Sequence, residues 1–431
     1  MHFHAGYSIG CLPPGGSFGD SRLKLWGVYT QVRSATDAAT VRRSVDYLVR
    51  ENIVIFYHGY NIRSPKNHSI LMLLESLLEA NFSIDENGIR VTSVSPKSAE
   101  MFWQFGVVLG KLVPQGGKFL VSAELAACDP KILSRFIEGL RLAGTTVVDL
   151  GVLPRPMVYY AARRIHADGL AMITTSDSLG LKWQIGEAVP DSRQVETLKN
   201  LLLEINSVKP SKSQGRKVRF WDVTYDYVDW LQETWFDSAA KKMHIVLEAC
   251  GGVWTGRARR YLQAVFPQIV FSEVSDEHNQ FHAIAEEVDR MRAELGFILG
   301  PGGGQLTVVD GYGIPYTAEE LNGLLLESFG DSLHSEIFLH DAQCSPRILS
   351  KAADYGATVR EIPSDESSFR REIMKTSAIF GADSTGHHYF RATCGNNDAL
   401  FTACWLLDFL AHSNQTLVQH RKSSATPVGG N

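Results

Sequence analysis

The feature that most constrains the fold is a strand–helix rhythm that repeats three times along the chain. In the first round, residues 118–122 and 146–151 are short apolar, β-branched runs, and a helical pattern at residues 130–143 separates them. A second helical stretch at residues 156–166 leads to another apolar run at residues 169–174. Strands that alternate with helices at this spacing favour a mostly parallel sheet with helices packed on its faces.

The rhythm returns twice further along the chain. The second round has strands at 243–247, 269–271 and 296–299, with helices at 255–265 and 282–295. The third round has strands at 336–339 and 358–361, with helices from 317, at 345–355 and from 365. We therefore predict an α/β fold with three consecutive domains whose sheets are mixed but mostly parallel.

Domain limits follow from these rounds and from the composition between them. Residues 1–86 form a predicted small N-terminal α/β extension of unknown role, with helices at 40–51 and 71–80 and a strand at 53–57. A chain of 431 residues suits several domains, because one hydrophobic core rarely serves so many residues. The predicted domains are 87–200, 201–310 and 311–413, followed by a polar, flexible tail at 414–431.

The composition excludes several classes of partner and site. Forty-two basic and forty-seven acidic residues give a net charge of −5, so no strong positive field favours nucleic acid or an anionic membrane. The six cysteines include no C-x-x-C pair, which predicts neither a disulfide framework nor a zinc site. No apolar run reaches the ~18 residues of a membrane helix, and the N-terminus has no secretory pattern. We predict a cytoplasmic protein without a membrane or nucleic-acid partner.

A series of motifs, in collinear order, resembles one known family. Residues 149–156, Asp-Leu-Gly-Val-Leu-Pro-Arg-Pro, look like a strand end and the Thr-Pro turn that follows it. Residues 167–176 look like the strand that delivers a catalytic phosphoserine, and residues 87–90, Asn-Gly-Ile-Arg, resemble a Gly-Ile-Arg-Gly turn. Further likeness falls at 226–231, 296–310 and 380–390. Over about residues 87–412 the chain thus resembles the α-D-phosphohexomutase family of phosphoglucomutases and phosphomannomutases, which implies three phosphohexomutase-like domains.

The resemblance assigns candidate catalytic residues. In this family a phosphoryl group moves through a phosphoserine, while magnesium and a nearby lysine neutralise its charge. By resemblance Ser176 is the serine and Lys182 the lysine, and Arg90 is a candidate substrate contact. Asp177 stands where the family has histidine, and its negative charge opposes phosphorylation of the neighbouring serine. The alternative is that Ser176 is an ordinary loop serine, and contact with a ligand is about equally expected.

The family's metal loop is altered. Its Asp-Gly-Asp-Gly-Asp-Arg pattern aligns with residues 300–305, which are Gly-Pro-Gly-Gly-Gly-Gln. Magnesium needs anionic oxygen to offset its dehydration, so the loss of all three carboxylates predicts no metal site, no cofactor and no magnesium-dependent transfer. A glycine-rich turn can instead cradle phosphate through backbone N–H groups. No Gly-Lys-Ser/Thr follows, so this is not a P-loop, and we favour a loop that has only lost its ligands.

The family's sugar loop, Gly-Glu-x-Ser-Gly-His, is partly kept. Residues 381–387 are Gly-Ala-Asp-Ser-Thr-Gly-His. Asp383 shortens the carboxylate by one methylene, Thr385 keeps the hydroxyl, and His387 follows the glycine. The resemblance implies that these three residues bind substrate hydroxyls. The same composition is ordinary in turns, but the Gly-His match in register favours ligand contact.

Two further family loops have no counterpart. A family member continues into a fourth domain whose Arg-x-Ser-Gly-Thr-Glu-Pro loop grips the substrate phosphate, and no such motif follows residue 398. The arginine expected after the 118–122 strand is replaced by Ala-Glu-Leu-Ala at residues 123–126. Positioning and charge neutralisation supply nearly all phosphoryl-transfer catalysis, so we expect the chain to be inert as a mutase.

Three interpretations of function follow. The first is a pseudoenzyme that binds a small-molecule sugar phosphate or polyol in the inter-domain cleft, as a regulator or for a different chemistry. The second is an active phosphosugar mutase completed by another chain or by the N-terminal extension, where His58, Arg63 and Lys66 are candidate phosphate contacts. The third is a non-catalytic structural or regulatory partner in a homo- or hetero-oligomer. The altered loops favour the first, although fold alone does not decide function.

Overall fold

The computed structural model describes residues 82–91, 98–124, 129–175, 178–187, 189–203, 205, 211, 214–216, 222–235, 242–249, 251–274 and 280–425. The helices and strand predicted in the N-terminal extension lie outside these residues, as do Ser176 and Asp177. Within the described residues, no helix combines the length and the apolar character needed to span a membrane.

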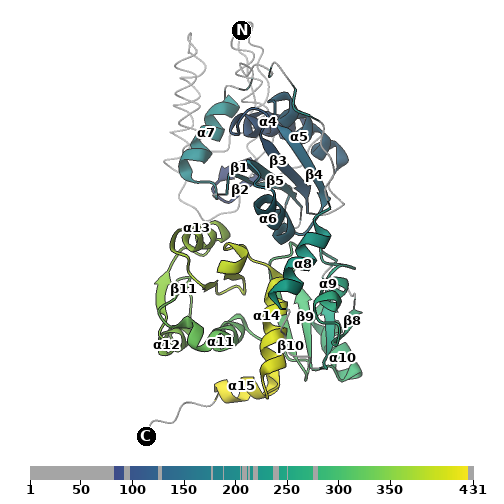
Figure 1. The fold of residues 1–431 in the computed structure, drawn as a ribbon, viewed down its shortest axis with the longest axis vertical. Helices are drawn as coiled ribbons and strands as arrows, with labels where there is room; N and C mark the ends of the chain where they lie inside the picture. The colour runs from purple at the N-terminus through teal and green to yellow at the C-terminus, as the bar shows by residue number, and fades with distance from the viewer. Residues whose placement is uncertain are drawn as a thin grey trace, which may run out of the picture. The chain divides into compact units, whose positions relative to one another are not determined.

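The first sheet has six strands in the order β1-β2-β6-β5-β3-β4. β3 pairs in parallel with β4 and with β5, and the remaining pairs are antiparallel. The strands are β1 (Phe82–Asp85), β2 (Gly88–Val91), β3 (Lys118–Ala123), β4 (Thr146–Val152), β5 (Gly169–Thr174) and β6 (Gly180–Ile185). The helices of this domain are α4 (Ser98–Lys111), α5 (Pro130–Leu142), α6 (Arg155–Arg164) and α7 (Ser192–Leu203) (Figure 1).

The second sheet has the order β10-β9-β7-β8. β7 pairs in parallel with β8 and β9, and β10 closes the sheet antiparallel to β9. The strands are β7 (His244–Glu248), β8 (Val270–Val274), β9 (Leu295–Leu299) and β10 (Leu306–Asp310). Helices α8 (Thr224–Thr234), α9 (Ala258–Val265) and α10 (Gln280–Met291) belong to this domain.

The third sheet has the order β12-β11-β13-β14, again with one antiparallel pair at its end. Its strands are β11 (Ile337–His340), β12 (Thr358–Glu361), β13 (Phe380–Ala382) and β14 (His388–Phe390). The accompanying helices are α11 (Ala318–Phe329), α12 (Pro346–Asp354), α13 (Glu366–Thr376), α14 (Ala399–His412) and α15 (Leu417–Ala425), with 3-10 turns η2 (Gly330–Leu333) and η3 (Arg391–Thr393).

Aspartates set the start of the two helices that matter most for the site. The Asp365 side chain accepts from the Ser368 N–H and caps α13, which places Glu366 at the first helical position. Asp398 accepts from the N–H groups of Leu400 and Phe401 and caps α14. Such caps satisfy backbone donors that a helix leaves without partners at its N-terminus.

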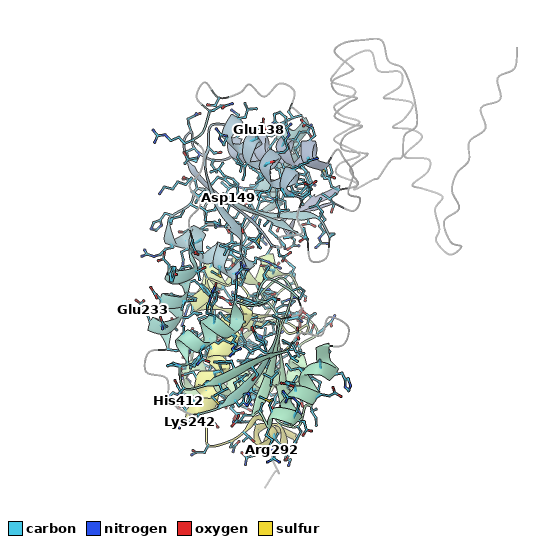
Figure 2. All side chains as sticks on the ribbon, turned by 90° about the vertical axis from the view of Figure 1, so that its right-hand side faces the viewer. Glu138, Asp149, Glu233, Lys242, Arg292 and His412 are labelled. Carbon is cyan, nitrogen blue, oxygen red and sulfur yellow. The ribbon has the colours of Figure 1, made fainter. Side chains whose placement is uncertain are left out.

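The apolar core is continuous through all three sheets. α14 is buried over most of its length and packs on α9, β9 and β10 of the second domain as well as on α11 (Figure 1). The Trp230 ring of α8 stacks on Phe401 of α14, with centroids 5.5 Å apart. Charged side chains such as Glu138, Glu233 and Arg292 are exposed and point outward (Figure 2).

The predicted α/β class with three domains of mixed, mostly parallel sheets is confirmed. The structure differs from the prediction at the end of the N-terminal extension and in the C-terminal tail. β1 falls inside the range assigned to the extension, yet Phe82 pairs with Val91 in the first sheet. α15 falls inside the predicted flexible tail, where His420 is buried and Arg421 forms an ion pair with Glu320. The polar composition of the tail predicted a flexible segment. It could not reveal the partner of Arg421, because Glu320 lies about a hundred positions earlier in the sequence.

Candidate functional site

β5 and β6 bring the predicted serine strand and Lys182 together. β5 is followed by Thr175, whose backbone N–H donates to Glu124 Oε2 at 3.1 Å. β6 runs antiparallel beside β5 and carries Lys182, whose ammonium lies 3.5 Å from Glu366 Oε2. Ser176 comes next after Thr175 in the sequence, so its catalytic role stays a prediction. Lys182 lies two residues after the start of β6, near the end of the strand pair from which the Ser176 loop extends.

A largely buried arginine forms the centre of the site. Arg155 is the first residue of α6, and its Nη1 donates to Glu366 Oε2 at 2.7 Å. Its Nη2 lies 3.6 Å from Glu124 Oε1. The Glu124 side chain is fully buried, whereas those of Arg155 and Glu366 are 17% and 14% exposed. Because Glu366 begins α13, this cluster ties the first domain to the third.

Mutual attraction keeps the members of this cluster charged. Burial raises the pKa of Glu366, but the charges of Arg155 and then Lys182 outweigh it and lower that pKa to about 2. Burial likewise opposes the charge on Arg155, yet Glu366 raises the Arg155 pKa above its ordinary value. Both groups are therefore ionised at neutral pH. Removing either one would leave the other with a single, more distant partner, Lys182 for Glu366 or Glu124 for Arg155.

The glycine-rich loop between β9 and β10 packs directly on the cluster. A Cβ on Gly302 would lie 2.6 Å from Arg155 Nη2 and 2.8 Å from Glu124 Oε1. A Cβ on Gly304 would lie 2.7 Å from the Asn397 side chain. A side chain at either position would require these neighbouring groups to move, because they fill the space that it would take.

Magnesium does not fit this loop. The loop itself supplies backbone carbonyls and the neutral Gln305 amide, and several of the carbonyls already accept hydrogen bonds. Gly303 O accepts from Trp254 Nε1 at 3.0 Å and from the Ala399 N–H at 3.1 Å, and Pro301 O accepts from the Val253 N–H at 3.2 Å. Within the part of the chain that is described, no three His, Cys, Asp or Glu side chains are grouped to hold a metal. The donor set lacks the anionic oxygen that magnesium requires.

Two backbone N–H groups of the same loop already have acceptors within it. Gly300 N–H donates to Gln305 O at 2.8 Å, and Gly303 N–H donates to Gly300 O at 3.0 Å. Gln305, which replaces the family's arginine, donates from Nε2 to Thr385 O at 2.8 Å. These bonds join the two ends of the loop and link it to the sugar loop, so we continue to favour lost ligands over a phosphate cradle.

Asp383 organises the predicted sugar loop from within. Its Oδ1 accepts from the Thr385 N–H at 2.9 Å, the Thr385 hydroxyl at 2.6 Å and the His387 N–H at 3.0 Å. Its Oδ2 lies 3.1 Å from His387 Nδ1 and accepts from the Tyr389 hydroxyl at 3.2 Å. Burial raises the pKa of Asp383, but these partners, His387 foremost, hold it well below its usual value. A sugar hydroxyl would have to displace one of them.

Thr385 and His387 remain accessible to a ligand. Thr385 is exposed, and the His387 side chain is 31% exposed, whereas Asp383 is only 4% exposed. Gln305 links the sugar loop, through Thr385, to the glycine-rich loop that packs on Arg155, and His387 also helps to lower the pKa of Glu366. The two accessible residues stay candidate ligand contacts.

Arg90 lies in a different setting. It is exposed on β2, opposite Ser83 and Gly180 in the sheet register. Among the described residues it has no ion-pair partner. The structure thus groups Lys182 with the sugar loop through Glu366, and it does not bring Arg90 into that group.

Sequence reasoning missed the three charged residues at the centre of the site. Glu124 stood out only as one of the residues that replace an expected arginine, and Glu366 belongs to no motif. Arg155 carried the one usable signal, since an arginine between two prolines directly after a strand lies where functional loops of α/β sheets usually lie.

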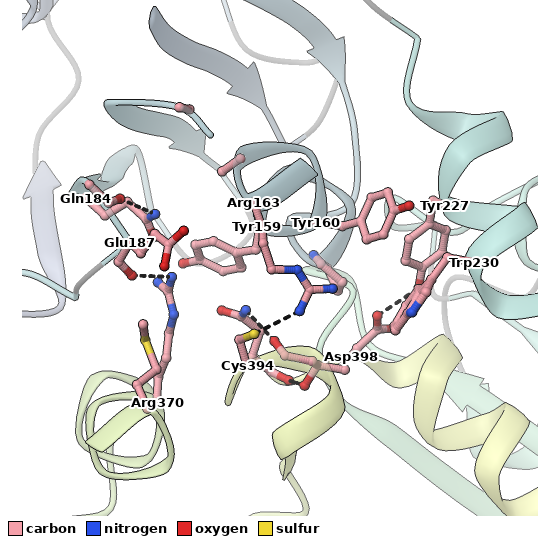
Figure 3. A pocket seen from close by; sticks show the side chains of 17 residues that line it. Tyr159, Tyr160, Arg163, Gln184, Glu187, Tyr227, Trp230, Arg370, Cys394 and Asp398 are labelled. Carbon is pink, nitrogen blue, oxygen red and sulfur yellow. Dashed lines mark hydrogen bonds between the residues drawn. The ribbon is translucent and has the colours of Figure 1, made fainter. Parts of the chain in front are cut away.

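The cavities near the site are small. Figure 3 shows a pocket lined by Tyr159, Tyr160, Trp230, Arg163 and Arg370 among others, with the Arg370 guanidinium 4.5 Å from the Tyr159 ring centroid. Its volume of about 50 Å³ holds a few water molecules and not a hexose phosphate. A second cavity, beside the Lys182–Glu366 pair, has a volume of about 10 Å³, about one water.

Comparison with known proteins identifies relatives of the first and third domains. Residues 83–181 match the family model for phosphoglucomutase/phosphomannomutase, alpha/beta/alpha domain I, and residues 319–427 match that for domain III. A phosphomannomutase/phosphoglucomutase of Pseudomonas aeruginosa is 22% identical over 303 residues, covering 66% of this chain and 64% of that protein. A phosphoglucosamine mutase of Wolinella succinogenes is 24% identical over 324 residues, covering 69% and 72%. The chain therefore spans slightly less than two thirds of its Pseudomonas relative.

Solved structures show the same fold. A phosphoglucomutase/phosphomannomutase family protein from Burkholderia thailandensis superposes with a TM-score of 0.69 at 20% identity, covering 78% of this chain and 79% of that one. A putative phosphomannomutase from Thermus thermophilus gives a TM-score of 0.68 at 16% identity, covering 80% and 83%. The superpositions show the fold, and with the models for domain I and domain III matched in order the chain belongs to the phosphoglucomutase/phosphomannomutase family of α-D-phosphohexomutases.

Proposed function

We propose that this chain binds a sugar phosphate or a polyol between the loops of its first and third domains and does not catalyse magnesium-dependent phosphoryl transfer. The packing at Gly302 is the observation that supports this most directly. Gly302 aligns with a metal-binding aspartate of the family, and Arg155 and Glu124 lie where such a side chain would have to go. A guanidinium and a coordinated magnesium ion cannot occupy one volume, so charge neutralisation by a metal has no centre here.

Groups suited to recognition nonetheless remain. Thr385 and His387 are accessible, and hydroxyl and imidazole groups pair well with sugar hydroxyls. Lys182 and Arg155 supply an ammonium and a guanidinium, which favour phosphate oxygens. The site therefore keeps binding chemistry at positions where it has lost catalytic chemistry.

A coupled assay tests the absence of turnover. It follows conversion of glucose 1-phosphate and mannose 1-phosphate to their 6-phosphates, with magnesium and the matching 1,6-bisphosphate present. We expect the wild type to show no more turnover than Ser176→Ala, because no metal centre neutralises the phosphoryl group. Turnover that disappears in Ser176→Ala would contradict the proposal.

Calorimetry tests the binding half of the proposal. We expect glucose 1-phosphate to bind more tightly than inorganic phosphate, and Thr385→Ala and His387→Ala each to weaken it by about tenfold, the loss of one hydrogen bond. Thr197→Ala, an exposed residue of α7, is the matched control. Equal affinity for the two ligands, with no effect of either variant, would remove the sugar loop from recognition.

A further inference from the structure

Two cations of the first domain converge on one carboxylate of the third. Glu366 Oε2 accepts from Arg155 Nη1 at 2.7 Å and lies 3.5 Å from Lys182 Nζ. We propose that Arg155 and Lys182 form an anion-binding site, that Glu366 occupies it as an internal competitor, and that a phosphate monoester displaces Glu366. This deepens the proposed function and rests on it for the sugar part of the ligand.

The site has hydrogen-bonding capacity that Glu366 does not use. Both cations meet the same oxygen of Glu366, while its Oε1 is buried and has no hydrogen-bond partner among the described residues. Arg155 Nε and Thr175 Oγ1 are also buried and have no hydrogen-bond partner within the described part of the chain. A carboxylate offers two oxygens in one plane, whereas a phosphate monoester offers three around a tetrahedral centre. Phosphate therefore suits this set of donors better than Glu366 does.

The surrounding charge matches a dianion. Three basic side chains, Arg155, Lys182 and Arg370, act on Glu366 and lower its pKa. One buried carboxylate, Glu124, opposes them at 3.6 Å from Arg155. Without Glu366 the group would carry three positive charges and one negative charge, a net charge of two. A phosphate monoester near pH 7 carries about −1.5 to −2, roughly the charge needed to balance it.

The contacts that hold α13 on the first domain are polar and permit displacement. Ser367, Arg370 and Arg371 donate to the backbone carbonyls of Glu86, Glu187 and Pro190 at 3.1 to 3.2 Å. Polar interfaces between domains of one chain usually allow relative motion. The cavity at Lys182 and Glu366 is only about 10 Å³, so a phosphate can enter only where Glu366 leaves. Anion binding is thus coupled to release of the N-terminus of α13.

Calorimetry with inorganic phosphate at fixed ionic strength tests the competition. Glu366→Gln keeps the shape of the side chain and removes the competing charge. We expect this variant to bind phosphate at least about tenfold more tightly than the wild type. The conformation in which residue 366 occupies the site should no longer dominate the population. Glu372→Gln is the matched control, since Glu372 lies on the same helix but pairs with Arg360 within the third domain. Equal or weaker binding by Glu366→Gln would overturn the proposal.

Two further measurements keep the test independent of one variant. In the wild type, saturating phosphate should speed hydrogen exchange in α13 and leave α11 unchanged; unchanged or slower exchange in α13 overturns the coupling. In the Glu366→Gln background, Lys182→Met should weaken phosphate binding at least about tenfold, by loss of a charge-assisted contact. Unchanged affinity would place the anion elsewhere and refute the site.

The two proposals fail separately. If inorganic phosphate behaves as expected but glucose 1-phosphate binds no more tightly, the sugar ligand of the proposed function is wrong and the internal competition by Glu366 stands. If glucose 1-phosphate binds tightly through Thr385 and His387 while Glu366→Gln changes nothing, the competition is wrong and the proposed function stands.

Discussion

Replacing Gly302 with alanine should destabilise the protein through the ion cluster and not through the backbone. Gly302 is not among the residues with positive φ, so an alanine there is free of left-handed strain. Its Cβ would lie 2.6 Å from Arg155 Nη2, roughly an ångström inside an ordinary contact of about 3.5 Å. Arg155 must then move, although Glu366 holds it at 2.7 Å.

The magnitude follows from the bond that this movement weakens. A hydrogen bond between charged groups contributes about 1.5–3 kcal/mol, and overpacking a well-filled site costs about 1–3 kcal/mol. We therefore expect Gly302→Ala to destabilise the protein by about 1–3 kcal/mol, a lowering of the thermal midpoint by about 1–4 °C for a folded unit of this size. Calorimetry or circular dichroism on heating measures the shift.

The control and the double variant separate this mechanism from general damage to the loop. In Gly300→Ala the nearest atom is Gln305 Cβ at 3.1 Å, so the cost should stay below about 1 kcal/mol. In a Glu366→Gln background the cost of Gly302→Ala should fall, because the bond that it disrupts is already weakened. The reasoning is refuted if Gly302→Ala costs no more than Gly300→Ala, or if its cost is the same in both backgrounds.

Two pH-dependent predictions concern other buried carboxylates. Burial raises the pKa of Asp398 to about 6, although the Tyr227 hydroxyl donates a hydrogen bond to it at 2.7 Å. The stability that protonated Asp398 contributes at low pH is therefore lost as the pH rises through 6. Tyr227→Phe should cost about 1.5–3 kcal/mol, and more at pH 8 than at pH 5; an equal cost at both pH values would contradict this. His420 and then Lys351 lower the pKa of Glu327 to about 2 against burial, so its contribution is present above pH 4.5 and lost as pH falls toward 2. Between pH 5 and pH 3 the wild type should lose about 1–2 kcal/mol more stability than Glu327→Gln in urea unfolding, and equal losses would show that the ion pair is not coupled to folding.

Local patterns in the sequence were sufficient for most strands and helices. The predicted strands at 169–174 and 358–361 coincide with β5 and β12, because short apolar or β-branched runs bounded by helices have few alternatives. β6 was not predicted, since Lys182 interrupts its buried residues and finds its partner only in the third domain. The four-residue strands β1 and β2 are too short to show a period.

The sequence motifs indicated which loops form the candidate site, but not which charged side chains meet between those loops. Resemblance located the loops, since each has a recognisable motif. The central pair joins Arg155 to Glu366, which are 211 positions apart, and no local pattern predicts which charge meets which across two domains. Asp383 shows the same limit: its shortened side chain suggested a changed reach toward ligand, whereas in the fold the carboxylate accepts its hydrogen bonds from its own loop and from Tyr389.

A glycine-rich loop without carboxylates, packed on a buried ion cluster, has one electrostatic consequence. A bound magnesium ion is a charge that dissociates, so the potential of such a site depends on metal concentration. Arg155 is a charge that does not dissociate, and Glu366 raises its pKa further. What can change at the Arg155 site is therefore the position of Glu366, and that position depends on α13. Under the proposed function, the charge available to a ligand thus depends on the contact between the first and third domains, which is the property that a binding switch needs.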